Sequence, residues 1–135
     1  MQKIILVTIL IFSIFILFSC KKDYSKISDY EWIAKSFKSN PTGVIDTTNK
    51  TYILDFDDNS FHFKLDVNAC GGKVNFKKNN QVSFSLPGCT EACCDEKFPT
   101  NIAENLPLIT SYELDGDKLI LMNSEPFLEI TFVKK

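Results

Sequence analysis

The sequence contains no arginine and only one histidine, His62. Nucleic-acid binding normally depends on a basic face and on bidentate arginine contacts, whereas this chain has a formal net charge of −2. A nucleic-acid-binding role is therefore not expected. The alternation of its strand places His62 on the solvent-facing side, with no serine or free cysteine to pair with it, so no catalytic triad is predicted. We expect no catalytic, cofactor-binding or metal-binding residues.

Long hydrophobic runs are also scarce, and the longest spans residues 4 to 18, directly after a lysine. A basic residue followed by about fifteen mostly apolar ones is typical of a secretory signal, because a spanning helix needs about 20 apolar residues. The run ends in LFSC at residues 17 to 20, which resembles the lipobox of bacterial lipoproteins. This resemblance implies that residues 1 to 19 are removed and that the Cys20 thiol is lipidated.

The lipobox resemblance also implies how and where the protein is attached. Cys20 would carry a diacylglycerol and an acylated amine, and two or more acyl chains hold a protein stably on a membrane. Residues 20 to 29 then form a polar tether, and loss of the signal lysine makes the net charge −3. Lysines at 21 and 22 stand where some inner-membrane lipoproteins have aspartate, which favours the outer membrane of a bacterial cell envelope. The alternative is an uncleaved signal anchor in which Cys20 is incidental.

The remaining residues, 30 to 135, have a length typical of one domain and contain no internal repeat or low-complexity segment. Short alternating apolar runs separated by turn residues predict a mainly β fold. The predicted strands are 52–56, 60–67, 73–77, 81–86, two strands within 111–122, and 127–133. The side chains expected to face inward are Phe61, Phe63, Leu65, Val67, Val74, Phe76, Val82, Phe84 and Leu86.

Turn residues and one helical pattern complete the predicted fold. Asp115-Gly116 lies between two apolar runs and favours a type I′ turn, Asn79 and Asn80 mark another turn, and residues 39 to 51 are a predicted surface loop. Within residues 94 to 107 three apolar side chains recur every four positions, which indicates one face of a short helix. They are Phe98, Ile102 and Leu106, with Pro99 suited to the first turn and with Asp95 and Glu96 suited to the positive amino end.

Several motifs resemble the META domain, which is found in heat-inducible bacterial outer-membrane lipoproteins. They are YEWIAKSF, NACGG, TEACC, EKF and YELDGDKLIL with LEITF, and together they cover about residues 30 to 135. The resemblance implies a compact antiparallel β domain with one short helix and a role in envelope stress. Cys70 and Cys94 resemble the two cysteines of that family. Gly71 replaces its usual asparagine, and Cys89 and Cys93 are additions.

Four cysteines remain once Cys20 is lipidated, and an exported domain of this size favours disulfides. Joining Cys93 to Cys94 would strain the peptide between them, so that pairing is discounted. Two arrangements stay open: Cys70 with Cys94 and Cys89 with Cys93, or Cys70 with Cys93 and Cys89 with Cys94. The META resemblance favours Cys70 with Cys94, and either arrangement would fasten the start of the helix to the sheet.

Other chemical interpretations of these motifs are weaker. Four thiolates can hold structural zinc, but paired C-x-x-C spacings are missing. A redox catalyst would show C-x-x-C at a helix start. Asp55, Asp57, Asn59 and Asp66 imitate a calcium loop but lack the required glycine and flanking helices, so we interpret them as a hairpin turn. Trp32 is expected to pack inside the first strand.

The sequence thus predicts a non-enzymatic, lipid-anchored envelope protein without a cofactor. Its disulfide-stapled domain, monomeric by expectation, would serve a stress-related or scaffolding role. The alternative is a protein-binding module or inhibitor that displays the loop at 39 to 51 or the cysteine-rich turn.

The lipid anchor makes a direct prediction for the mass of the native protein. Protein extracted from membranes should begin at Cys20, and its first peptide should carry the added mass of the diacylglycerol and acyl groups. Intact mass spectrometry with peptide mapping measures both quantities. A chain that retains residues 1 to 19 with an unmodified Cys20 would instead establish the signal anchor.

Overall fold

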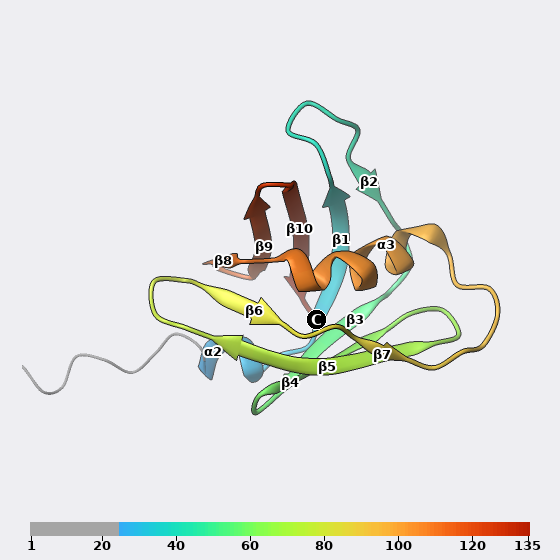
Figure 1. Cartoon of the computed structure of the whole chain (residues 1–135), viewed down its shortest axis with the longest axis horizontal. Helices are drawn as coiled ribbons and strands as arrows, with labels where there is room; N and C mark the ends of the chain where they lie inside the picture. The colour runs from blue at the N-terminus through green and yellow to red at the C-terminus, as the bar shows by residue number, and fades with distance from the viewer. Residues whose placement is uncertain (1–24) are drawn as a thin grey trace, which may run out of the picture.

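The structure is a computed structural model and describes residues 25 to 135. The predicted signal, Cys20 and the first part of the predicted tether lie outside these residues. Within the described part of the chain, no helix combines the length and hydrophobicity needed to cross a membrane. Figure 1 shows the arrangement of helices and strands.

One antiparallel sheet builds most of the molecule, in the order β6-β5-β4-β3-β1-β10-β9-β8. Its strands are β1 (Trp32–Lys38), β3 (Ile53–Asp57), β4 (Ser60–Lys64), β5 (Ala69–Phe76), β6 (Val82–Phe84), β8 (Ser111–Asp115), β9 (Lys118–Ser124) and β10 (Phe127–Lys134). Two short strands are added at the side: β2 (Asp46–Thr47) pairs with β1, and β7 (Gly88–Cys89) pairs with β5. The mainly β, antiparallel prediction is confirmed.

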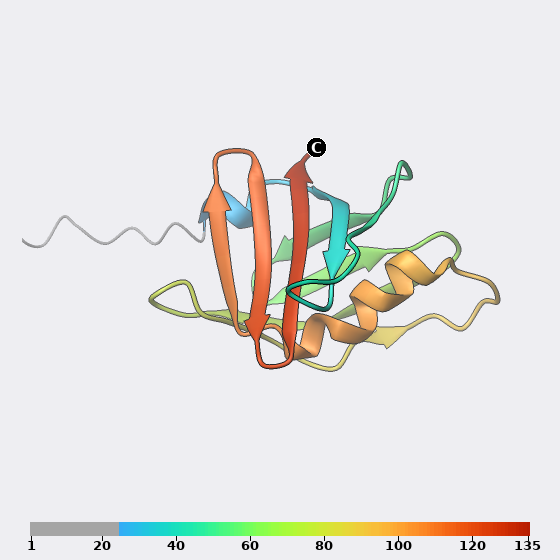
Figure 2. The ribbon, with the colours of Figure 1, turned by 90° about the horizontal axis from the view of Figure 1, so that it is seen from above.

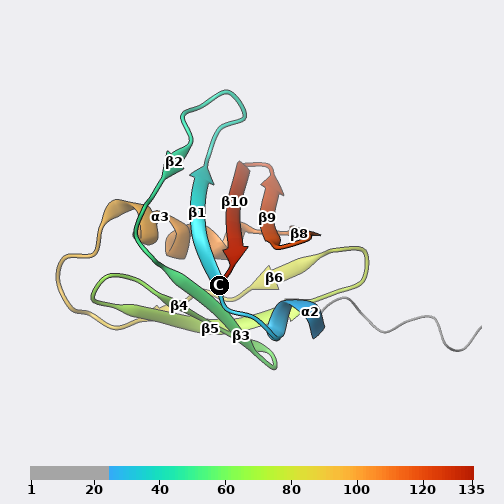
Figure 3. The same ribbon diagram turned by 180° about the vertical axis from the view of Figure 1, so that it is seen from behind.

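The sheet curls into a nearly closed barrel. Strands β8, β9, β10 and β1 form one wall and β3, β4, β5 and β6 form the other (Figures 2 and 3). The two ends of the sheet meet at an antiparallel bridge between Gln81 and Ser111, next to a hydrogen bond of 3.0 Å from the Val82 amide to the Thr110 carbonyl. This contact reduces the length of unpaired strand edge, which is a common route to aggregation.

One short helix, α3 (Lys97–Asn105), crosses between the two walls and continues into the 3₁₀ turn η2 (Leu106–Leu108) (Figure 1). The helical pattern is confirmed because Ile102 and Leu106 are fully buried and Phe98 packs against the core. Pro99 lies in the first turn of α3, where its missing N–H costs no helical hydrogen bond.

Seven of the nine side chains expected to face inward are buried, and Val67 and Leu86 are not. Val67 is 56% exposed and Leu86 is 83% exposed. Strand β4 ends at Lys64 and β6 ends at Phe84. Both residues therefore lie beyond the end of the strand to which the sequence pattern assigns them. Alternation holds only while the backbone stays pleated.

The hairpin between β8 and β9 differs from the predicted type I′ turn. Asp115 pairs with Lys118, so the loop consists of Gly116 and Asp117. Of these two residues only Gly116 has a positive φ, of 57°, whereas type I′ requires positive φ at both positions. Glycine at the first loop position with a negative φ at the second is the pattern of a type II′ turn. The Asn79-Asn80 turn is confirmed, with positive φ at both residues.

The folded core begins inside the segment predicted to be a tether. Helix α2 (Ser25–Ser28) is a single turn, and its Ile27 is completely buried. The Ile27 carbonyl accepts a hydrogen bond of 2.9 Å from Nε1 of Trp32. Trp32 is 1% exposed, which confirms the expectation that it packs in the first strand.

Gly72 of the NACGG motif allows close packing between β4 and β5. It lies opposite Phe61 in the strand register, and the Phe61 ring covers it. A Cβ atom at this position would lie 2.8 Å from Cε1 of Phe61 and 2.6 Å from Oγ of Ser85. The fully buried Phe61 therefore needs glycine at position 72.

Candidate functional site

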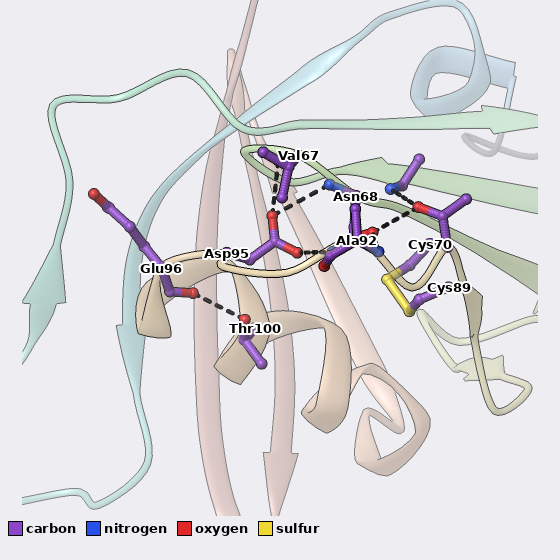
Figure 4. The surroundings of a disulfide bond; sticks show 10 residues. Val67, Asn68, Cys70, Cys89, Ala92, Asp95, Glu96 and Thr100 are labelled. Atoms are coloured by element: carbon purple, nitrogen blue, oxygen red, sulfur yellow. Dashed lines mark hydrogen bonds between the residues drawn. A yellow bond between two sulfur atoms is a disulfide. The ribbon is translucent and has the colours of Figure 1, made fainter.

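Asn68 joins two loops that are far apart in the sequence, the turn from β4 to β5 and the cysteine-rich segment 88 to 96. Its Oδ1 accepts hydrogen bonds from the Ala92 amide, at 2.7 Å, and from the Thr90 hydroxyl, at 2.8 Å. Its Nδ2 donates to the Ala92 carbonyl, at 2.6 Å, and to Oδ2 of Asp95 (Figure 4). A carboxamide offers two donor hydrogens and two acceptor lone pairs, and Asn68 uses all four.

Asp95 strengthens the same junction from the other side. Its Oδ1 accepts hydrogen bonds from the Val67 amide, at 2.8 Å, and from the Asn68 amide, at 3.3 Å. Desolvation opposes ionisation of this carboxylate, but the hydrogen bonds from Val67 and Asn68 outweigh it and lower the pKa of Asp95 below its usual value. The ionised carboxylate is therefore the form that fastens the loop.

A second cluster holds the start of α3. Oδ2 of Asp66 accepts a hydrogen bond of 2.9 Å from the Glu96 amide, and Nζ of Lys50 lies 3.2 Å from Asp66 and 2.5 Å from Glu96. The pKa of Asp66 is lowered, first by the Glu96 amide and then by Lys50. These ion pairs are exposed and individually weak. The hydrogen bond from the Glu96 amide to Asp66 is therefore the contact that positions the start of α3.

Tyr52 connects this cluster to the core. Its ring is buried, and its hydroxyl donates a hydrogen bond of 3.0 Å to Oε2 of Glu96. Burial, followed by the contact with Glu96, raises the pKa of Tyr52 to about 12. The hydroxyl therefore stays protonated at neutral pH and acts as a donor, which suits a structural role.

The first disulfide differs from both pairings that the sequence left open. Cys70 is bonded to Cys89, with 4.0 Å between their Cα atoms, so the pairing of Cys70 with Cys94 favoured by the META resemblance is wrong. The reason is the short strand β7, which places Cys89 directly opposite Cys70 of β5. Nothing in the sequence pattern indicated that Gly88–Cys89 would form a strand.

The second disulfide joins Cys93 to Cys94, so the expectation that strain excludes this pairing is wrong. Cys94 adopts φ of 88°, a left-handed conformation that residues with a side chain rarely adopt. The backbone turn at Cys94 therefore accommodates the bond between neighbours. Neither disulfide links the start of α3 to the sheet, although the sequence predicts such a link. Hydrogen bonds of Asp66, Asn68 and Asp95 hold the start of α3 there instead.

A cavity of about 400 Å³ lies between α3 and the two joined loops. Its apolar lining comes from Leu65, Cys70, Leu86, Pro87, Cys89 and Ala103, and its polar lining from Asn68, Thr90, Asp95, Thr100 and Glu104. The volume falls in the range of small-ligand pockets, and so does a largely apolar wall with a few polar groups. Leu86, which is 83% exposed, lies at its wall.

His62 and the aspartates of the calcium-like pattern do not form a site. His62 is exposed on β4, opposite Asp55 of β3. Burial is the main cause of the raised pKa of Asp55, and His62 partly opposes it. The hairpin interpretation of the calcium-like pattern is confirmed for Asp55, Asp57 and Asn59, which lie in or beside the β3–β4 turn. Asp66 instead belongs to the cluster at α3. Across residues 25 to 135, no three His, Cys, Asp or Glu side chains are arranged to hold a metal ion.

The comparisons with known proteins identify a fold but no family. No protein-family model matches the chain, and no curated protein matches its sequence. The structure is similar to the crystal structure of a DUF4847 family protein from Bacteroides vulgatus ATCC 8482, with a TM-score of 0.63 over 83% of this chain and 96% of that chain. The two sequences are 12% identical, so this likeness shows a shared fold alone.

The lowered pKa values of Asp66 and Asp95 predict a loss of stability in acid. A carboxylate with a lowered pKa contributes stability that is present above its ordinary pKa and is lost as pH falls through the lowered value. We expect the free energy of unfolding to decrease below about pH 4, and Asp95→Asn to reduce this dependence. Urea unfolding at several pH values measures it.

The matched control is Asp117→Asn, since Asp117 is 85% exposed and lies 4.0 Å from Lys134. This substitution should leave the pH profile unchanged. Equal flattening by both substitutions would contradict the assignment of acid sensitivity to the junction.

Proposed function

We propose that this protein is a lipid-anchored, non-enzymatic binding protein of the bacterial cell envelope, and that its cavity receives an apolar side chain of a partner protein. The single observation that carries the proposal is the cavity beside α3, whose wall includes a leucine that is 83% exposed. Exposing a leucine to water is unfavourable by about 1.5 to 3 kcal/mol relative to burial. A partner that covers Leu86 would recover part of this energy.

The walls of the cavity are suited to binding without rearrangement. Asn68 and Asp95 fix one rim, the Cys70–Cys89 disulfide forms part of the wall, and α3 supplies Thr100 and Ala103. A preformed site loses little conformational entropy on association. Pockets that receive a single apolar or aromatic anchor commonly supply much of the affinity of a protein interface.

The predicted lipid on Cys20 is the basis for placing this binding in the envelope. The loop at residues 39 to 51 is the alternative binding surface. Val44 and Ile45 of that loop are 86% and 53% exposed, but among the described cavities none is lined by them. The META resemblance, and the stress-related or scaffolding role that it implies, stay predictions. They are compatible with a binding protein because both roles require a partner.

Leu86→Glu tests the cavity. The substitution places a carboxylate at an exposed position, so the fold should be unaffected, while partner binding should fall by about tenfold or more because a charge would be buried without a counter-ion. The measurement is cross-linking of the full-length, membrane-anchored protein in intact envelopes, followed by quantitative capture. Binding of the recovered partner is then titrated.

Val44→Glu is the matched control, since it places the same charge at an equally exposed apolar residue outside the cavity. It should retain the partner. Loss of the partner with Val44→Glu and retention with Leu86→Glu would transfer the site to the loop at 39 to 51. Retention by both variants would contradict binding at the cavity.

A further inference from the structure

The bond between Cys93 and Cys94 lies outside the proposed binding cavity. Cys70 and Cys89 line that cavity, whereas Cys93 and Cys94 do not. Both residues are exposed, and they lie in the segment that leads to α3. The bond therefore has no part in the packing that shapes the cavity.

The two disulfides differ in what protects them. Cys70 is 2% exposed and belongs to the core. Its partner Cys89 is exposed, but it pairs with Cys70 in the ladder of β5 and β7, where the Thr90 amide donates a hydrogen bond of 3.0 Å to the Ala69 carbonyl. A thiolate that attacks the sulfur of Cys89 would have to expel Cys70 as a thiolate into an apolar interior, where its charge is disfavoured. Cys93 and Cys94 are both exposed, so attack on either sulfur would expel the other toward water.

The disulfides also differ in what depends on them. The bond between Cys70 and Cys89 spans 19 positions, and the bond between Cys93 and Cys94 spans one. In the chain-entropy account a bond that closes a very short loop removes little freedom from the unfolded chain. Cys93–Cys94 therefore contributes little to the stability of the domain.

The segment around Cys93 and Cys94 is held on both sides without their bond. On one side, both the amide and the carbonyl of Ala92 are hydrogen-bonded to the Asn68 side chain. On the other side, Asp95 accepts hydrogen bonds from the Val67 and Asn68 amides (Figure 4). Breaking the bond would leave these contacts in place, so the loop would keep its position.

The geometry points to Cys93–Cys94 as a thiol–disulfide exchange site that accepts two electrons from low-molecular-weight thiols while the domain stays folded. A thiolate attacks one of the two sulfurs, forms a mixed disulfide with it and releases the other as a thiolate, which takes a proton from water. A second small thiolate attacks the small-molecule sulfur of the mixed disulfide, forms the oxidised small disulfide and releases the remaining protein sulfur as a thiolate, which also takes a proton from water. The products are two adjacent protein thiols and one oxidised thiol pair, and Cys70–Cys89 is unchanged.

The exchange is tested by titrating the full-length protein, purified in mild detergent, with dithiothreitol. Thiols are trapped with iodoacetamide at each step, and peptide mass mapping reports each cysteine pair separately. We expect Cys93 and Cys94 to be alkylated at reductant concentrations at least about tenfold lower than Cys70 and Cys89. Near-ultraviolet circular dichroism and the melting temperature should be nearly unchanged at that stage.

Two double variants provide the controls. Cys93→Ser with Cys94→Ser should leave the melting temperature nearly unchanged and abolish the early alkylation, whereas Cys70→Ser with Cys89→Ser should lower the melting temperature and leave early alkylation intact. Simultaneous reduction of both pairs, earlier reduction of Cys70–Cys89, or loss of tertiary structure on reduction of Cys93–Cys94 would overturn the proposal. Free thiols at both positions before any reductant is added would overturn it as well.

Discussion

The Asn68 carboxamide is the contact on which the arrangement around the cavity depends. It bonds to both backbone groups of Ala92, to the Thr90 hydroxyl and to Asp95. Each such hydrogen bond contributes about 0.5 to 1.5 kcal/mol net, and the larger constraint is that an isosteric change at Asn68 would leave several partners unsatisfied. The curled sheet supplies the core, but this one side chain decides where the cysteine-rich segment lies on it.

Three features of the molecule depend on the position of the cysteine-rich segment. The start of α3 is brought to Asp66, whose carboxylate accepts a hydrogen bond from the Glu96 amide. Cys89 is set opposite Cys70, so a disulfide closes one wall of the cavity. Cys93 and Cys94 remain outside, on a loop that does not rely on their bond. Polar contacts thus perform the fastening that the cysteines alone were expected to provide.

The parts of the fold that the sequence predicts well are those governed by local periodicity. Phe61, Phe63, Val74 and Phe76 alternate along real strands and are buried, and the four-residue spacing of Phe98, Ile102 and Leu106 identifies α3. The predictions fail where a strand ends. Val67 and Leu86 continue an apolar alternation in sequence, but the chain has already turned, and no local pattern marks that point.

The candidate site is less predictable because it is made by tertiary contacts. The motifs NACGG and TEACC lie in the two segments that form the junction. The roles of Asn68, Thr90 and Asp95, however, depend on hydrogen bonds between residues more than 20 positions apart. The predicted disulfide pairing is wrong for the same reason, because the actual pairing of Cys70 with Cys89 depends on β7, a strand of only two residues. An asparagine placed before a cysteine-containing strand was the one signal in the sequence that could have indicated the junction.

Amide hydrogen exchange of an Asn68→Ala variant tests the central role of this side chain most directly. We expect faster exchange at the amides of Ala92, Val67 and Glu96, with unchanged protection in β9 and β10 and no change anywhere in a matched Asn75→Ala variant. Exchange at Ala92 that is as slow in Asn68→Ala as in the unsubstituted protein would contradict it, because the loop would then be held by something other than Asn68.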